Sequence, residues 1–162
     1  HWQLASAGQT DEKLLSLLND LEYYRLPYPK SLSTDFGTDV VYTLIRNKKI
    51  RTEDAIRTYI DHVAIQIAHA VRSLPNISSG SKMLVTGSCT HHDFLVTRIK
   101  QFLQEFNIDV VVPDKNIIDH KETIIIALIG ILRWREENNV LASATGASAD
   151  SIGGAVWMGQ EA

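Results

Sequence analysis

One stretch of the chain changes within a few residues from a strand-like to a helix-like pattern. Residues 83–86 are mostly aliphatic, and Gly87 with the small or polar residues after it interrupts the run. Apolar residues then recur at helical spacing, as Phe94, Leu95, Ile99, Phe102 and Leu103. A strand, a tight turn and a helix are therefore predicted. Such a turn suits a phosphate or nucleotide, because it gathers backbone N–H groups and the positive end of a helix dipole. Many turns of this kind bind nothing, so both interpretations stay open.

A second short apolar run follows the predicted helix. Residues 108–112 are rich in β-branched side chains and have the length of a buried strand. Two strands joined by a helix form a parallel βαβ unit, here over residues 82–112. The sequence therefore predicts an α/β fold in which helices pack on a small mixed or parallel sheet.

Two amphipathic helices are predicted before the first strand. Thr10 or Asp11 is expected to cap the earlier one, which carries leucines at spacings of three and four. Thr52, followed by two acidic residues, opens the longer one. Its buried face is expected to consist of Ile56, Ile60, Val63, Ile67, Val71 and Leu74. His62 and His69 are interpreted as histidines at the polar edge of this face.

A connector with two prolines joins these helices. Residues 26–33 are expected to follow an extended path, because proline fixes its own φ and restricts the residue before it. Lys30 is either a solvated surface charge or the cation of a cleft, and the sequence leaves both open. A short helix over residues 35–45 is expected next.

The last third of the chain is predicted to contain a strongly apolar helix. Residues 124–132 are apolar on nearly every side, which predicts a helix buried on every side. Asp119 is expected to begin this helix, and Glu122 three residues later matches a capping box, in which the glutamate bonds back to the backbone N–H of the cap. Alternatively, Glu122 faces a cleft and contacts a substrate hydroxyl. Residues 152–158 are expected to form a terminal strand.

The composition sets limits on partners and compartment. The 162 residues carry a net charge of −3 and no basic stripe, so no nucleic-acid partner is expected. Cys89 is the single cysteine and has no partner for an internal disulfide, and no apolar run is long enough to cross a membrane. We therefore expect a cytoplasmic protein without a membrane partner. The first residue is His1 rather than Met, which suggests a piece of a longer chain.

Potential metal ligands are concentrated in the turn after the first strand. They are Cys89, His91, His92 and Asp93. Adjacent side chains at a helix start point in different directions, and no second cluster at zinc spacing completes a tetrahedral site. We expect no metal site here, and a metal-binding α/β module is the third hypothesis for this chain.

Five short segments are similar to motifs of a known family, which are given in parentheses: Ala5 to Gln9 (Ala-x-x-Gly), Leu26 to Leu32 (Pro-Pro-Lys-Ser), Val85 to Ile99 (Gly-Gly-Gly-Ala-x-Asn and a helix), Asp119 to Leu128 (Lys-Glu-Ala) and Asn139 to Ala147 (Asn-Leu-Pro-x-x-Thr-Gly-Ala). In their order and spacing, these segments resemble the carboxyl-terminal part of the anhydro-N-acetylmuramic acid kinase family. The resemblance runs through most of the chain. It implies that residues 1–162 form the carboxyl-terminal lobe of a two-lobed, actin-like (ribonuclease H-like) sugar-kinase ATPase fold.

The resemblance also implies a reaction. Family members use Mg-ATP and water to open the anhydro ring and phosphorylate the sugar 6-hydroxyl, giving N-acetylmuramic acid 6-phosphate in peptidoglycan recycling and amino sugar catabolism. The residues expected at the nucleotide are Gly87, Ser88, Cys89 and Thr90, and Glu122 is expected near the sugar. The catalytic aspartate and the first phosphate-binding loop belong to the family's amino-terminal lobe. This chain alone is therefore not expected to turn over substrate.

The glycine-rich loop departs from the family pattern. Two glycines, the alanine and the asparagine of that pattern are replaced in Gly87-Ser88-Cys89-Thr90-His91-His92. Added Cβ atoms restrict the backbone and the close approach of a ligand. A second hypothesis is therefore a non-catalytic relative that binds a sugar or nucleotide. The helices around Ile60 and Ile126 are candidate surfaces for a homodimer.

Overall fold

The computed structural model describes residues 2–27, 30–75, 77–78 and 80–159. Contacts divide the chain into two compact units, residues 1–113 and residues 114–162, which are described separately. The fold is α/β, with a two-stranded parallel sheet and many helices. Pro29 of the predicted extended connector lies outside the described residues.

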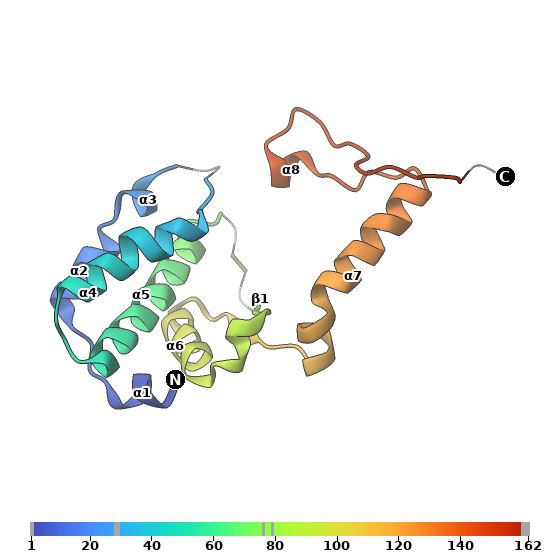
Figure 1. Ribbon diagram of the computed structural model, residues 1–162. Coiled ribbons are helices and arrows are strands. Elements are labelled where there is room, and N and C mark those ends of the chain that lie inside the picture. The colour runs from blue at the N-terminus through green and yellow to red at the C-terminus, as the bar shows by residue number, and fades with distance from the viewer. Residues whose placement is uncertain (1, 28–29, 76, 79, 160–162) are drawn as a thin grey trace. The chain divides into compact units, whose positions relative to one another are not determined.

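The first unit contains eleven named elements in its described residues (Figure 1). In chain order they are α1 (Trp2–Ala7), α2 (Glu12–Asn19), α3 (Glu22–Arg25), the π-helix η1 (Phe36–Val41), α4 (Tyr42–Asn47), α5 (Thr52–Arg72), β1 (Lys82–Leu84), the 3₁₀-helix η2 (Ser88–His91), α6 (Asp93–Leu103), the 3₁₀-helix η3 (Gln104–Phe106) and β2 (Asp109–Val111). The short helix predicted over residues 35–45 is thus a π-helix followed by an α-helix.

Two strands of the first unit are joined through a helix. β1 and β2 pair in parallel with Lys82 opposite Asp109 and Leu84 opposite Val111, and α6 connects them. The connection ends at Asn107, whose φ of 53° lies in the left-handed region that asparagine tolerates. α6 begins at Asp93, and the residues before it form η2.

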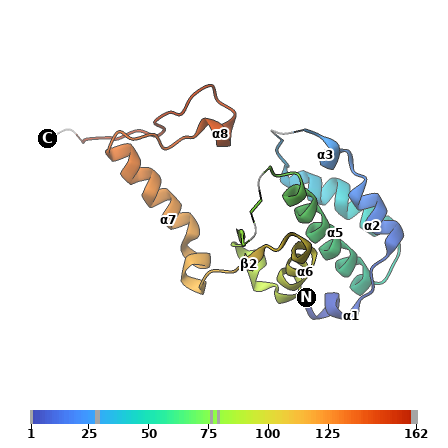
Figure 2. The same cartoon turned by 180° about the vertical axis from the view of Figure 1, so that it is seen from behind.

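α5 is the central helix of the first unit. It lies between α2 and α6 in both views (Figure 1, Figure 2). Its small residues Ala64 and Ala68 pack with Ile99 and Leu103 of α6 in one apolar cluster. A second cluster contains Leu14 and Leu18 of α2 with Val41. Of the two caps predicted for α2, Thr10 and Asp11, the structure has Asp11, whose carboxylate accepts from the amide of Leu14 at 2.7 Å.

Val71 of the predicted apolar face of α5 is buried, but three polar residues of this helix are buried as well, which corrects the prediction. Leu74 lies beyond the helix and is 59% exposed, whereas Thr58, Asp61 and His62 are each at most 2% exposed. These polar groups are buried because residues 9–19 supply hydrogen-bond partners. The amide of Asp11 donates to the hydroxyl of Thr58 at 2.9 Å, for example. Helical spacing alone does not reveal such partners.

His62 is therefore a core residue and not a polar-edge histidine. Its Nε2 lies 3.0 Å from the hydroxyl of Tyr24, and its Nδ1 lies 2.7 Å from Oδ1 of Asn19. The amide nitrogen of Gln66 also donates to this Oδ1, so the oxygen is an acceptor and Nδ1 carries the proton. Burial lowers the pKa of His62 to about 4, which keeps the ring neutral. His69 is exposed, as predicted.

Gly8 allows α1 to approach the start of α5. An added Cβ at this position would clash with the carbonyl of Glu53 and lie 2.9 Å from the backbone nitrogen of Asp54. The carboxylate of Asp54 accepts from the amide of Gln9 at 2.8 Å. The close contact with the backbone of α5 explains a glycine here.

The second unit consists of α7 (Lys115–Trp134), α8 (Ala142–Thr145) and an isolated antiparallel bridge between Val140 and Ser151. No residue of α7 is buried, contrary to the helix expected to be buried on every side; Ile126 is 67% exposed. Its own unit offers α7 few neighbours, since only short loops and α8 follow it. The terminal strand predicted over residues 152–158 is absent, because the described pairing of this segment stops at Ser151.

Candidate functional site

The chain leaves β1 through a turn built on Gly87. The amide of Val85 donates to the carbonyl of Val111 at 2.9 Å, so pairing continues one residue past the strand. Gly87 then adopts φ 94° and ψ 176°, a combination that essentially requires glycine. An added Cβ would meet no atom within 4 Å. Open space therefore lies beside Gly87 at the carboxyl end of a parallel strand, where α/β proteins bind ligands.

The residues predicted to contact a nucleotide differ in exposure. Ser88 and Cys89 are exposed, and Gly87 is half-buried. Thr90 is only 6% exposed, and its hydroxyl donates to the carbonyl of Gly87 at 2.6 Å. Thr90 therefore closes the turn, whereas the side chains of Ser88 and Cys89 face the solvent from which a ligand would come.

Thr86 is a candidate site residue that the sequence did not indicate. Its hydroxyl oxygen is buried and has no hydrogen-bond partner among the described residues. An unsatisfied buried hydroxyl costs about 1–3 kcal/mol, which a ligand group bonded to it would offset. Threonine is common in strands, so only the tertiary surroundings mark Thr86 as unusual.

The start of α6 carries its own negative charge. His92 precedes the helix without a side-chain capping bond, and Asp93 lies in the first turn. The carboxylate of Asp93 already complements the positive end of the helix dipole. A phosphate placed at this helix end would therefore meet a like charge, which favours contact with an uncharged part of a nucleotide.

Asp61 anchors the helix that follows this turn. One carboxylate oxygen accepts from Nε of Arg98 on α6 at 2.6 Å. The other accepts from Nε of Arg57 at 3.0 Å and from the hydroxyl of Thr10 at 2.5 Å. Asp61 is 2% exposed, so these bonds lie in the interior. One carboxylate therefore joins α5, α6 and the segment before α2.

Glu122 lies on α7 in the second unit and does not belong to a capping box. α7 begins at Lys115, and Asp114 is its cap, with a carboxylate that accepts from the amide of Ile117 at 3.1 Å. Asp119, the predicted cap, is inside the helix and forms an ion pair with Lys115. Asp114 competes successfully because it follows Pro113 and has the extended backbone of a cap. Glu122 is exposed, so its carboxylate is accessible.

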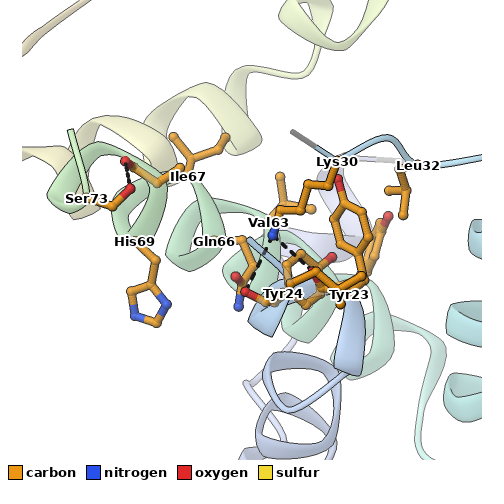
Figure 3. Close-up of a pocket in the computed structure, with 12 residues that line it drawn as sticks. Tyr23, Tyr24, Lys30, Leu32, Val63, Gln66, Ile67, His69 and Ser73 are labelled. Carbon is orange, nitrogen blue, oxygen red and sulfur yellow. Dashed lines mark hydrogen bonds between the residues drawn. The ribbon is translucent and has the colours of Figure 1, made fainter. Parts of the chain in front are cut away.

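A separate cleft lies between α3, the connector after it and α5. Its volume is about 560 Å³ (Figure 3). Lys30 lines this cleft and is half-buried, so the structure favours the cleft cation over the solvated charge. Its Nζ donates to the carbonyl of Tyr23 at 3.0 Å and lies 4.6 Å from the centre of the Tyr23 ring.

Neither a metal centre nor a membrane span emerges from the described residues. Within them, no three His, Cys, Asp or Glu side chains come together as metal ligands. No helix in the described part of the chain is both long and apolar enough to cross a bilayer.

Comparison with known proteins points to one family. The family model of anhydro-N-acetylmuramic acid kinase matches residues 2–159. The chain is 30% identical over 100 residues to the anhydro-N-acetylmuramic acid kinase of Aliivibrio fischeri, covering 61% of this chain and 27% of the relative. The enzyme of that name from Vibrio parahaemolyticus is 28% identical over 148 residues, which is 90% of this chain and 40% of the relative.

A third relative is similar over nearly the whole chain. The anhydro-N-acetylmuramic acid kinase of Coxiella burnetii is 26% identical over 160 residues, covering 98% of this chain and 42% of the relative. The chain thus spans about two fifths of the length of this relative and of the Vibrio protein.

Proposed function

This chain belongs to the anhydro-N-acetylmuramic acid kinase family, and we propose that it forms the carboxyl-terminal lobe of such a kinase. The full-length enzyme would use Mg-ATP and water to open the anhydro ring and phosphorylate the sugar 6-hydroxyl. N-acetylmuramic acid 6-phosphate would be the product, in cytoplasmic peptidoglycan recycling. A homodimer is part of the proposal, and the exposed apolar residues of α7 are one surface that supports it.

The turn after β1 carries the proposal for the nucleotide. Gly87 leaves open space at the end of a parallel strand, and the unsatisfied hydroxyl of Thr86 lies directly before it. A nucleotide group that accepts or donates one hydrogen bond would satisfy Thr86. Ser88 and Cys89 would line the same space, and Thr90 would hold its shape through Gly87.

Glu122 would bind the sugar. A carboxylate accepts hydrogen bonds from sugar hydroxyls, and this one is exposed and not used as a helix cap. ATP would supply the phosphoryl group. We assign no ligand of Mg²⁺ to the described residues, since no group of three metal-binding side chains occurs among them. The catalytic residues would lie in the amino-terminal lobe, as the resemblance implies, so this chain alone would be inactive.

A non-catalytic relative is the alternative function. Ser88 and Cys89 replace glycines of the family pattern, and Asp93 adds a carboxylate where a phosphate would approach α6. Both features weaken nucleotide binding. Such a protein would bind the sugar or a nucleotide without transferring phosphate.

ADP release by the full-length protein tests the proposal. With Mg-ATP, we expect ADP to form only when anhydro-N-acetylmuramic acid is present. Glu122→Ala should lower kcat/KM for the sugar by at least about tenfold, because it removes a charged hydrogen-bond acceptor. Glu137→Ala, which removes an exposed carboxylate just after α7, is the matched control and should leave kcat/KM unchanged.

The alternative, a non-catalytic relative, predicts no ADP release. A folded full-length protein that binds the sugar or a nucleotide but releases no ADP would be the non-catalytic relative. Activity in which Glu122→Ala equals Glu137→Ala would retain the kinase and remove Glu122 from the sugar site.

A further inference from the structure

The cleft beside Lys30 has the size of a small-molecule site. Its volume of about 560 Å³ lies within the range of roughly 300–1,000 Å³ that is usual for such sites. Its walls are mainly apolar and aromatic, with Tyr23 and Tyr24 from α3 and Tyr59 from α5. None of residues 86–93 lines it. The cleft is therefore distinct from the turn to which we assign the nucleotide.

Lys30 is held at one end of this cleft. Its ammonium donates to the carbonyls of Tyr23 at 3.0 Å and Tyr24 at 3.5 Å, and it lies over the Tyr23 ring. Figure 3 shows these three residues together, with His69 and Ser73 towards the other end of the cleft. The carbonyls and the ring fix the position of the charge, so binding a ligand costs little additional ordering of this side chain.

The charge of the lining is positive. The lining contains the ammonium of Lys30 and no aspartate or glutamate. Gln66 also lines the cleft. Its side-chain nitrogen donates to Oδ1 of Asn19 at 2.9 Å, and this bond orients the side-chain oxygen of Gln66. A charge in a cleft with apolar walls is less screened than one at an open surface, which strengthens its attraction for an anion.

We propose that this cleft binds a small organic anion with a flat, apolar ring system. The rings of Tyr23, Tyr24 and Tyr59 contact the apolar body, and the ammonium of Lys30 attracts the acidic group. Both properties are needed, because the walls give no preference for charge and Lys30 alone gives no apolar contact. This inference is independent of the kinase activity.

A pair of fluorescent probes separates these two contributions. 8-Anilinonaphthalene-1-sulfonate carries a sulfonate on a flat ring system, and N-phenyl-1-naphthylamine has the same rings without the charge. We expect the native full-length protein to bind one sulfonate probe per chain at the cleft, with a saturable rise in fluorescence. Lys30→Met should weaken this binding about tenfold or more and change binding of the uncharged probe less than twofold.

Two further variants test the location. Ala70→Phe places a ring in the lining contributed by α5 and leaves the charge of Lys30 in place, and it should weaken binding of both probes. Lys49→Met removes an exposed cation that lines a different cavity, of about 430 Å³, and should have no effect on either probe. The Ala70 variant also keeps the test valid if Lys30→Met does not fold.

Three results would overturn the proposal. If Lys30→Met and Ala70→Phe both bind the sulfonate probe with the affinity of the wild-type protein, the probe binds outside this cleft. Absence of saturable binding to the folded wild-type protein would show that the cleft takes no such anion. Competitive displacement of the probe by ATP would mean that the cleft belongs to the nucleotide site. A lack of kinase activity would not affect any of these readouts.

Discussion

At the scale of single residues, two neighbouring polar side chains in the interior differ in the surroundings that they require. Asp61 and His62 are adjacent on α5, both nearly inaccessible to solvent, and both fully used in hydrogen bonds. Asp61 accepts hydrogen bonds from two arginines, whereas burial lowers the pKa of His62 and keeps its ring neutral. Neighbouring residues on one helix thus require opposite surroundings, which the helices on either side of α5 provide.

Stability should fall in mild acid because of His62. The pKa is about 4 in the folded protein and about 6.5 in an unfolded chain. Between these pH values the unfolded state binds more protons than the folded state. The contribution of neutral His62 to the free energy of unfolding is therefore fully present above pH 6.5 and is lost as the pH falls toward 4. The difference corresponds to about 3 kcal/mol. We expect His62→Gln to remove this part of the pH dependence in urea unfolding measured from pH 7 to 4.5.

His69→Gln is the control for this experiment. His69 lies on the same helix but is exposed, so its replacement should leave the slope of stability against pH unchanged. Equal slopes for the wild type and His62→Gln would contradict the assignment of a buried neutral histidine.

At the scale of elements, the turn between β1 and α6 depends on one backbone conformation. Residues with a Cβ avoid the φ and ψ of Gly87, although space for the Cβ exists. Gly87→Ala should therefore cost about 1–3 kcal/mol through strain or shift the turn. If the full-length protein has the proposed kinase activity, we expect its apparent affinity for ATP to fall about tenfold or more, measured by calorimetry with a non-hydrolysable ATP analogue.

Gly37→Ala is the matched glycine control. Gly37 lies in η1, has no atom within 4 Å of an added Cβ and does not have a positive φ. Its replacement should not alter nucleotide affinity. If Gly87→Ala and Gly37→Ala bind the analogue equally well, the turn after β1 is not the nucleotide site.

At the scale of the whole molecule, the Asp61 network joins segments far apart in the chain. Thr10, Arg57 and Arg98 belong to three different segments and meet at one carboxylate. Asp61→Asn would leave both guanidinium groups partly buried without their anion. We expect a loss of about 3 kcal/mol in the free energy of unfolding, measured by urea denaturation of the full-length protein.

An exposed ion pair serves as the control for the loss expected in Asp61→Asn. Arg72 and Glu105 join α5 to η3, which directly follows α6, but their side chains are 60% and 56% exposed. Glu105→Gln should cost less than about 1 kcal/mol, because water screens the pair. A similar loss for both variants would mean that burial does not strengthen the Asp61 network.

Periodicity and local chemistry were sufficient to predict much of the first unit. The βαβ unit follows from two short apolar runs on either side of a helical pattern, and the cap at Asp11 follows from its position before regularly spaced leucines. Gly87 was found as a turn residue for the same reason. These features depend on neighbours within a few residues, which the sequence displays directly.

Other features depend on which segments meet. The sequence determined α5 as a helix, but the partners supplied by residues 9–19 decided that Thr58, Asp61 and His62 would be buried in place of Leu74. The pattern around Glu122 was that of a capping box, but α7 begins earlier, with Asp114 as its N-cap. Lys30 became a cleft cation because α3 placed two carbonyls and a ring beside it. In each case, the result depends on which segments meet and offer burial or hydrogen-bond partners, and this is decided by the tertiary structure.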